Sequence, residues 1–336
     1  MRGRVVVERI WSEEGAGLLP ALLAPAELAY RAALRVRNAA YDRGWRRVER
    51  APVPVVSVGN LTVGGSGKTP FTAWLAGRLR GMGLRPAVVL RGYGGDETLL
   101  HRELNPGVPV FVARRRPAGA RRAAAEGCDV VLLDDGFQHR ALYRELDLVL
   151  IAADSWSGAV RLLPRGRWRE PLEALGRADA AVVVRKTANR SNADAAAARV
   201  AECHPRLPLL TCRIRPRRFF SLFPERADLP PPVFAHQPVL AVAGIADPRP
   251  LVRHLEEAGA SPELLPFPDH HRYTQRDARE IVQKAKGRVV ITTSKDAVKL
   301  GSLLPPHLAV FVLRQEVEVE RGSGTLDRLL QGALGW

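Results

Sequence analysis

A glycine-rich loop lies between an apolar run and a helical pattern, and its residue types suit it to bind phosphate. The segment reads VPVVSVGNLTVGGSGKTPFTAWLAGRL over residues 53–79. Glycines let backbone amides turn towards phosphate oxygens, and the start of the following helix adds partial positive charge. Lys68 can reach the β and γ phosphates of a nucleotide, and Thr69 can ligate Mg²⁺. The segment therefore predicts a nucleotide site formed by Thr62, Val63, Gly64, Gly65, Ser66, Gly67, Lys68 and Thr69.

The loop departs from the strict P-loop pattern at its start. That pattern has glycine five positions before the Gly-Lys pair, where this chain has Thr62. A Gly-Lys-Thr triplet also occurs by chance in loops. The apolar strand before it and the helix after it nevertheless favour nucleotide binding.

A second polar cluster follows another apolar run, in DVVLLDDGFQHR over residues 129–140. A strand that ends in carboxylates beside a P-loop strand is a common way to hold Mg²⁺, so Asp134 and Asp135 join Thr69 as predicted metal ligands. The alternatives are a helix cap or a turn. Gln138 and His139 come next, at the end of the strand where ligands bind in open α/β sheets. We expect both to line the site.

The elements that must position these residues alternate in a regular way. Short apolar runs separated by helix-length segments are typical of crossover units and a parallel sheet, so we expect an α/β fold with a P-loop NTPase-like domain. A Pro-rich, aromatic stretch at 213–238 interrupts the alternation and suggests a connection, which could carry extended strands, to a second, smaller α/β domain. The expected strands lie at 53–59, 86–90, 108–112, 129–135, 146–153 and 180–184, then at 239–245, 288–294 and 308–313. The expected divisions are 1–50, 51–212, 213–238 and 239–336.

Composition limits the possible partners. The chain has 336 residues and a formal charge of +16, which favours nucleic acid, an anionic membrane surface or a phosphorylated substrate. Its three cysteines lack the spacing of a zinc site or a disulfide framework, which fits a reducing cytosol. The N-terminus lacks the pattern of a signal peptide.

The first 50 residues form a distinct helical segment. Residues 15–34 are weakly charged but too short in apolar length to span a membrane comfortably. Arginines interleaved with Tyr30, Tyr41 and Trp45 follow, which is typical of a helix lying in a lipid interface. A helix packed on its own domain would have a similar composition.

With these residues assembled, the chain resembles the tetraacyldisaccharide 4′-kinase family. The resemblance spans nearly the whole chain, although RGYG runs almost directly into GDETLL where the family usually has a longer insert. It rests on ten ordered blocks: RNAAYDRG (37–44), VPVVSVGNLTVGGSGKTP (53–70), RGYG (91–94), GDETLL (95–100), GVPVFVARRR (107–116), LDDGFQHRAL (133–142), LLPRGRWREP (162–171), VAGIADP (242–248), FPDHHRYT (267–274) and TTSKDAVKL (292–300).

The resemblance implies transfer of the γ-phosphoryl group of ATP to the 4′-hydroxyl of a tetraacylated glucosamine disaccharide 1-phosphate in lipid A biosynthesis, with Mg²⁺. It implies a peripheral enzyme at the cytoplasmic face of the inner membrane, with an anionic lipid surface as partner and no nucleic acid. We assume a monomer, since no sequence feature indicates an oligomer.

The resemblance also implies roles for single residues. It pairs Asp96, a candidate catalytic base, with His270 across the two domains, and places Lys68 with them in the catalytic set. The substrate-binding residues that it implies are Glu97, Arg116, Arg169 and Glu170, which join Gln138 and His139 from the end of the acidic strand. From the residues alone, a surface histidine is the favoured interpretation of His270, ahead of metal ligation together with Asp269 and His271. The roles of Lys295, Asp296 and Lys299 are not indicated.

Two other functions fit the P-loop and the charge. A basic P-loop ATPase acting on nucleic acid would show salt-sensitive binding. A membrane-recruited switch would hydrolyse nucleotide without an acceptor.

Overall fold

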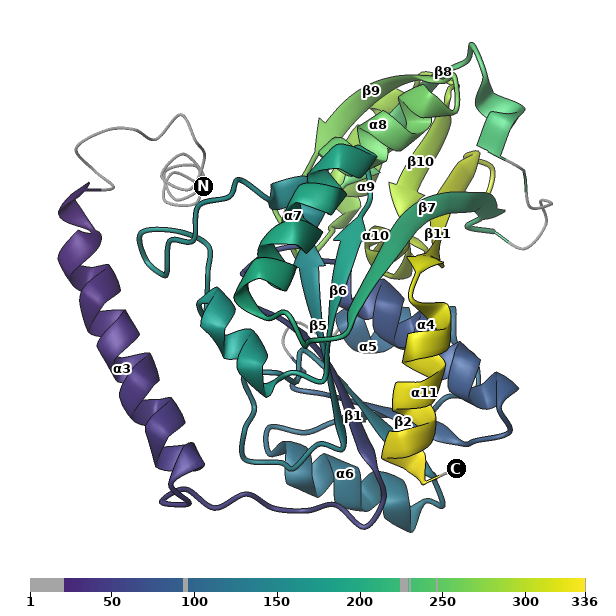
Figure 1. The fold of residues 1–336 in the computed structure, drawn as a ribbon. Coiled ribbons are helices and arrows are strands. Elements are labelled where there is room, and N and C mark those ends of the chain that lie inside the picture. Colours follow the sequence, from purple (N-terminus) through teal and green to yellow (C-terminus); the bar gives the residue numbers. More distant parts are fainter. Residues whose placement is uncertain (1–20, 93–95, 224–228, 230, 246, 336) are drawn as a thin grey trace. The chain divides into compact units, whose positions relative to one another are not determined.

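The computed structural model describes residues 21–335 except 93–95, 224–228, 230 and 246 (Figure 1). The chain divides into two compact units. The first contains residues 1–91, 107–213 and 319–336, and the second contains residues 92–106 and 214–318.

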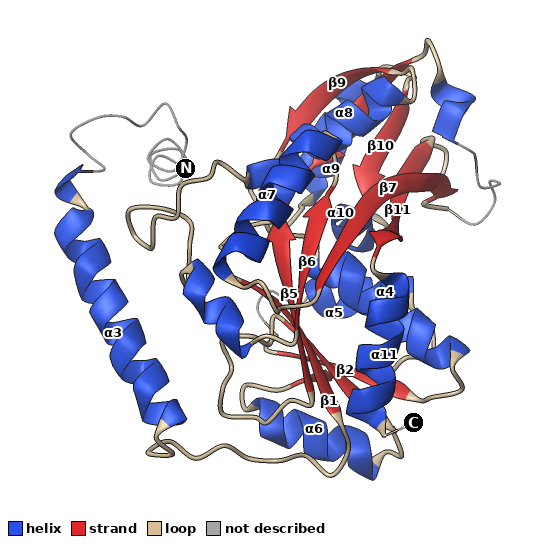
Figure 2. Ribbon diagram, in the orientation of Figure 1, coloured by secondary structure: helices blue, strands red, loops and turns tan. Residues whose placement is uncertain are grey.

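The first unit is built on a sheet with the strand order β3-β2-β4-β1-β5-β6-β7. Figure 2 shows the strands in red and the helices in blue. Its strands are β1 (Val55–Asn60), β2 (Pro86–Leu90), β3 (Val110–Val112), β4 (Val130–Asp134), β5 (Leu146–Ala152), β6 (Ala180–Arg185) and the start of β7 (Leu209–Ser221). Neighbours from β3 to β7 pair in parallel. Strands β1, β2 and β4 are buried along their whole lengths, which explains their uninterrupted apolar runs.

Helices cover this sheet and complete its core. They are α3 (Ala24–Asp42), α4 (Lys68–Gly81), α6 (Arg116–Ala125), α7 (Arg190–Cys203) and α11 (Ser323–Leu334), with short 3₁₀ turns η1 (Ala153–Ser155) and η2 (Leu172–Arg177). Small residues of α6 pack against β2 and β4, and those of α7 pack against β6. Because β1 lies between β4 and β5, the loop after β1 lies in the middle of the carboxyl edge.

The second unit repeats the parallel pattern on a smaller scale, with the order β11-β10-β8-β9. Its strands are β8 (Pro238–Ala243), β9 (Ser261–Pro266), β10 (Val289–Thr293) and β11 (Val310–Arg321). Its helices are α5 (Asp96–Leu104), α8 (Arg249–Glu257), α9 (Gln275–Ala285) and α10 (Ser294–Leu300), with a 3₁₀ turn η3 (Pro231–Phe234). An α/β fold with a second, smaller α/β unit is therefore confirmed.

Strand β9 was not expected, and β7 begins before the stretch 213–238, for which a connection that could carry extended strands was expected. Strand β7 begins at Leu209 and continues into the stretch 213–238. Its start was not recognised because the buried residues Leu210, Cys212 and Ile214 alternate with polar ones instead of forming an apolar run. Strand β9 lies at the edge of the sheet and contains Pro262 and Pro266. Proline lowers strand propensity but is tolerated in an edge strand.

The division into units differs from the expected boundaries in two places. Residues 92–106 belong with the second unit because α5 packs on α10 and Glu103 pairs with Arg314 at 3.6 Å. The last residues return to the first unit, where Asp327 of α11 forms an ion pair with Arg78 of α4. Asp96 and His270, which we expected in different domains, therefore lie in the same unit.

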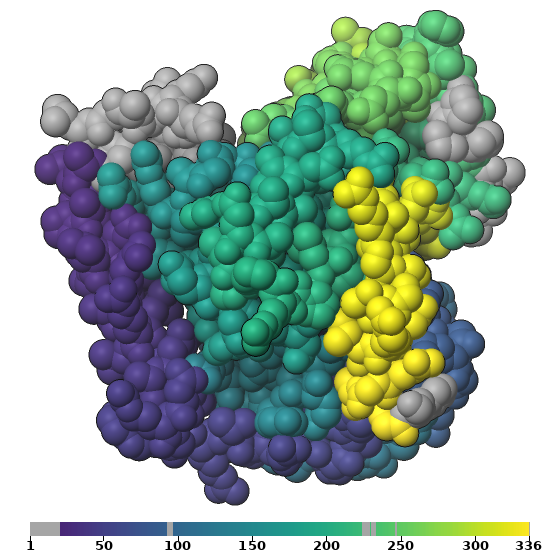
Figure 3. Space-filling model, in the orientation of Figure 1, coloured from purple at the N-terminus to yellow at the C-terminus, as the bar shows by residue number. Residues whose placement is uncertain are grey.

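Helix α3 lies at the surface of the first unit (purple in Figure 3). Its acidic residue Glu27 is buried and accepts the amide hydrogen of Leu162 at 2.8 Å, whereas Leu28 and Val36 are 66% and 70% exposed. The inward side of the helix thus combines the buried carboxylate of Glu27 with the apolar side chain of Leu34, while Leu28 and Val36 face outward. No helix in the described part of the chain has both the length and the apolar character needed to cross a membrane. Residues 1–20 of the expected N-terminal segment lie outside the described residues.

Candidate functional site: a phosphate loop facing an acidic strand end

The loop between β1 and α4 has the form of a phosphate-binding loop. Gly64 and Gly67 have φ angles of 109° and 84°, which glycine adopts without the steric cost that a Cβ brings. The buried Asn60, at the end of β1, donates from Nδ2 to Ser66 Oγ at 2.7 Å and so fixes the loop from inside. Helix α4 begins at Lys68, so its unpaired N-terminal amides lie next to the loop.

The acidic end of β4 lies directly beside this loop. Strands β4 and β1 pair in parallel with Asp134 opposite Val58. Asp135 follows with a φ of 58°, a left-handed conformation that aspartate tolerates better than most residues and that often marks functional positions. Its carboxylate lies 3.5 Å from Lys68 Nζ. The structure thus brings the predicted phosphate-binding lysine and a predicted metal ligand together.

A second cation reaches the same carboxylate. Arg169 Nη1 donates to both oxygens of Asp135 at 3.0 Å and approaches Gln138 Oε1 at 3.4 Å. Burial alone would raise the pKa of Asp135, but the charges of Lys68, Arg169 and Arg116 outweigh it and hold this pKa below its usual value. Asp135 is therefore ionised at neutral pH.

Arg116 and Gln138 both donate hydrogen bonds to backbone carbonyl oxygens next to the phosphate loop and the acidic strand end. Arg116, at the start of α6, is buried and donates from Nη2 to the carbonyl oxygen of Asp134 at 3.2 Å. Gln138 donates from Nε2 to the carbonyl oxygen of Asn60 at 2.8 Å. These contacts connect the end of β4 to the end of β1, so both side chains lie at the site where the sequence placed them.

His139 completes the cluster as a neutral imidazole. Burial, followed by the positive charges of Arg116 and Arg144, lowers its pKa to about 4. A histidine with this pKa carries no charge at pH 7. A neutral imidazole can donate or accept a hydrogen bond with a ligand without adding to the positive charge of the site.

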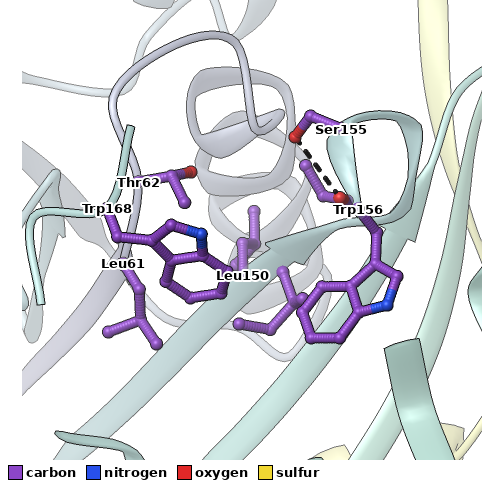
Figure 4. Close-up of a pocket in the computed structure, with 8 residues that line it drawn as sticks. Leu61, Thr62, Leu150, Ser155, Trp156 and Trp168 are labelled. Carbon is purple, nitrogen blue, oxygen red and sulfur yellow. Dashed lines mark hydrogen bonds between the residues drawn. The ribbon is translucent and has the colours of Figure 1, made fainter. Parts of the chain in front are cut away.

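The segment 161–170 runs alongside the start of the phosphate loop. The amide of Val63 donates to Arg167 O at 2.8 Å, and the amide of Arg169 donates to Leu61 O at 2.7 Å. Between these bonds, Trp168 packs edge-on against Trp156 with their ring centroids 6.0 Å apart. Figure 4 shows the small apolar hollow that results; it is lined by Leu61, Thr62, Leu150, Ile151, Ala152, Ser155, Trp156 and Trp168.

Glu170 points away from this loop and into the protein. Its side chain is fully buried, where it forms ion pairs with Arg37 at 3.4 Å and Arg177 at 3.1 Å and accepts from Asn38 Nδ2 at 3.3 Å. Arg37 and Asn38 belong to α3. The geometry thus favours an indirect role for Glu170 rather than contact with substrate.

Two functional candidates were missed by sequence reasoning. Lys186, just after β6, donates from Nζ to Gly65 O in the phosphate loop at 2.7 Å. Asp154 in η1 accepts the backbone amides of Lys186, Thr187 and Ala188 at 2.7, 2.7 and 2.8 Å and so holds this lysine's backbone in place. The available signal was the position of Lys186 at the carboxyl edge of the expected strand 180–184.

The remaining predicted residues belong to the second unit. His270 lies in the turn between β9 and α9, with a φ of 57°, and Glu97 lies in α5. Asp96 is the first residue of α5, but its side chain is outside the described part of the chain, as are residues 93–95.

Comparison with known proteins gives a consistent result. A sequence model of the family described as tetraacyldisaccharide-1-P 4′-kinase matches residues 19–98 and 94–334. The two matched stretches overlap at 94–98, where RGYG runs almost directly into GDETLL.

Individual relatives match over most of their length. A tetraacyldisaccharide 4′-kinase from Anaeromyxobacter sp. (strain K) is 38% identical over 98% of this chain and 95% of its own. Another, from Chlorobium luteolum, is 39% identical over 83% of this chain and 86% of its own. The crystal structure of LpxK from Aquifex aeolicus in complex with ATP matches with a TM-score of 0.74 and 29% identity, covering 94% of this chain and 99% of that one.

Proposed function

The chain belongs to the tetraacyldisaccharide-1-P 4′-kinase family, and we propose that it transfers the γ-phosphoryl group of ATP to the 4′-hydroxyl of a tetraacylated glucosamine disaccharide 1-phosphate in lipid A biosynthesis. The observation that carries the proposal is the approach of Lys68 and Arg169 to Asp135 beside the phosphate loop. Two cations meet there at one carboxylate, beside the loop that leads into the start of α4. That arrangement suits a transfer in which charge spreads over phosphoryl oxygens.

Residues of the first unit bind the phosphoryl donor. The amides of the phosphate loop and of the start of α4 bind the phosphates, and Lys68 neutralises the charge of the transferred group. Asp135 pairs with Lys68 and keeps its ammonium beside the loop. Arg169 supplies a planar fork that can bind phosphate oxygens at two points.

The residues around the loop also fit a magnesium ion. Thr69 is the second residue of α4, Asp134 ends the strand that pairs with β1, and Asp135 follows it. One hydroxyl and one or two carboxylates, together with substrate phosphates and water, form a usual Mg²⁺ ligand set. When bound, the ion would neutralise charge on the phosphates. Arg116 holds the backbone of Asp134 and Asp135 in place for this task.

The second unit supplies the group that accepts the proton of the attacking hydroxyl. We assign this role to Asp96, oriented by His270, on the strength of the family resemblance. Attack on phosphorus forms the new O–P bond as the bond to ADP breaks, and the hydroxyl proton must leave at the same time. A carboxylate is a suitable acceptor, and Glu97 beside it is assigned to the acceptor sugar.

The outward face of α3 supports a peripheral position at the cytoplasmic face of the inner membrane. Leu28 and Val36 on α3 and Trp45 after it are all strongly exposed, and arginines lie among them. Apolar and aromatic groups flanked by arginine suit the boundary of an anionic lipid layer. The acyl chains of the acceptor remain in that layer while the sugar is phosphorylated. We propose that the enzyme acts as a monomer.

Transfer of label from ATP to a purified lipid A disaccharide 1-phosphate in detergent micelles tests the function. We expect labelled lipid with the wild-type protein and none above background with Lys68→Ala or Asp96→Ala. Omitting Mg²⁺ and adding a chelator should also abolish labelling. Nucleotide hydrolysis without labelled lipid would refute the acceptor, and labelling by Asp96→Ala at the wild-type rate would refute the proposed base.

A further inference from the structure

A buried carboxylate in the second unit has no assigned role. Asp296, in α10, has no solvent-exposed surface and belongs to the block TTSKDAVKL. Its Oδ2 accepts the backbone amide of Gly244 at 3.0 Å and the hydroxyl of Thr293 at 2.7 Å. Lys299, one turn further along the helix, lies 3.7 Å from Oδ1. Burying a charge is unfavourable unless it is paired and hydrogen-bonded, so these contacts account for how Asp296 is tolerated.

Gly244 connects this carboxylate to the turn that carries His270. Its amide hydrogen goes to Asp296, while its carbonyl oxygen accepts the backbone amide of His270 at 3.1 Å. The backbone of Gly244 is thus hydrogen-bonded both to the carboxylate of Asp296 and to the backbone of His270. The position is also closely packed, because a Cβ at Gly244 would lie 2.8 Å from Tyr273 Oη and 2.9 Å from Asp296 Oδ1.

The turn itself needs external support. His270 has a φ of 57°, a left-handed conformation that costs energy for a residue with a Cβ and persists only where surrounding contacts impose it. The bond to Gly244 O is one such contact. A second contact is the stacking of Phe267 on His271, whose ring centroids lie 5.1 Å apart. It joins a residue before His270 in the chain to the residue that follows it.

We propose that Asp296 is a positioning residue, which holds Gly244 so that the turn presents His270 in one conformation. All of these residues belong to one unit, so the chain of contacts is independent of any movement between units. The inference rests on the proposed role of His270 in the phosphoryl transfer. It assigns a task to the acidic residue of TTSKDAVKL, which neither the loop chemistry nor the family resemblance explains.

A double-mutant cycle tests this inference. Asp296→Asn keeps the shape of the side chain but removes its charge, and we expect kcat to fall by about tenfold or more, since small errors in positioning reacting groups are costly. KM for ATP should stay within about twofold, because the phosphate loop lies in the other unit. In a His270→Ala background, the same Asp296→Asn change should have almost no further effect on kcat, because residues that act through one another are not additive.

Two further variants keep the test decisive. Gly244→Ala leaves every charge in place but crowds Tyr273 and Asp296, so it should reproduce the fall in kcat and its disappearance in the His270→Ala background. Glu280→Gln removes an exposed acidic group from neighbouring α9 and should leave kcat unchanged. Thermal melting of each variant identifies an assay temperature at which all are folded.

The outcomes separate the inference from the function on which it rests. If His270→Ala lowers kcat and the effects of the two substitutions multiply, Asp296 does not act through His270 and the inference alone is refuted. If His270→Ala retains the wild-type kcat while the lipid is still labelled, the role of His270 is refuted and the inference falls with it. Effects of Asp296→Asn and Gly244→Ala that both vanish without His270 support the inference.

Discussion

The hydroxyl of Tyr30 donates a hydrogen bond to the carbonyl oxygen of Arg169 at 3.0 Å. Tyr30 lies in α3, and Arg169 contacts Asp135 at the phosphate loop. Glu170, the next residue, binds Arg37 and Asn38 of the same helix. The helix that we place at the membrane is therefore connected directly to an arginine of the site.

This connection predicts that Glu170 matters without touching substrate. Glu170→Gln leaves Arg37 and Arg177 without their buried carboxylate, and loss of one partner from a buried ion pair typically costs about 3 kcal/mol. We expect a lower midpoint in urea unfolding together with a lower kcat.

The matched control is Glu173→Gln, which changes an exposed glutamate three residues further along the chain and should alter neither quantity. Tyr30→Phe removes only the hydroxyl and should cost about 1 kcal/mol of stability. Wild-type activity and stability in Glu170→Gln would contradict a positioning role for this residue.

A second prediction concerns Asp154 and Lys186. Asp154→Asn replaces one acceptor oxygen by an amide donor, so it should release some of the backbone amides that hold Lys186 against Gly65. We expect the KM for ATP to rise about threefold to tenfold, corresponding to roughly 1 kcal/mol, with a smaller change in kcat. Asp194→Asn, in the exposed ion pair with Arg321, is the control and should leave this KM unchanged. An ATP KM equal to that of the wild type in Asp154→Asn would show that this loop is not part of the nucleotide site.

The low pKa of His139 predicts a pH dependence of stability. Its pKa in the folded protein is about 4, below the value near 6.5 expected when unfolded, so the unfolded chain binds the proton more readily. The contribution is fully present above pH 6.5 and is lost as pH falls towards 4. Allowing for solvent screening at this half-buried site, the wild type should lose about 2 kcal/mol over this range relative to His139→Gln. Urea unfolding at pH 7.5, 6, 5 and 4 measures the difference, and parallel curves for the two proteins would contradict the buried neutral imidazole.

The exposed face of α3 predicts membrane binding. Leu28→Glu and Val36→Glu place charge where we expect acyl chains, so co-sedimentation with vesicles containing anionic lipid should decrease by about tenfold or more for the double variant. Val112→Glu changes another exposed valine in the same unit and should bind vesicles as the wild type does. Because both positions on α3 are exposed, the thermal unfolding midpoint should change little. Undiminished sedimentation of the double variant would place the lipid-binding surface elsewhere.

Much of the donor site could be predicted from the sequence, because its residues lie next to one another in the chain or at the ends of recognisable strands. Lys68 follows a glycine loop, and Asp135, Gln138 and His139 follow an apolar strand. Parallel pairing brings strand ends to one edge of a sheet, so these groups had to meet once β1 and β4 became neighbours. The family resemblance added Arg169, and the structure places its guanidinium against Asp135.

The sequence by itself determined the α/β fold, the phosphate loop and the acidic strand end, since each is a local pattern of residue type and spacing. Only the tertiary structure decided that Glu170 is buried against α3, that Lys186 reaches Gly65, that Asp296 holds Gly244, and that α5 belongs with the second unit. These contacts join residues far apart in the chain, and they depend on strand order, helix packing and burial. Hydrophobic periodicity reports which face of an element is buried, but it does not report which distant residue lies against that face.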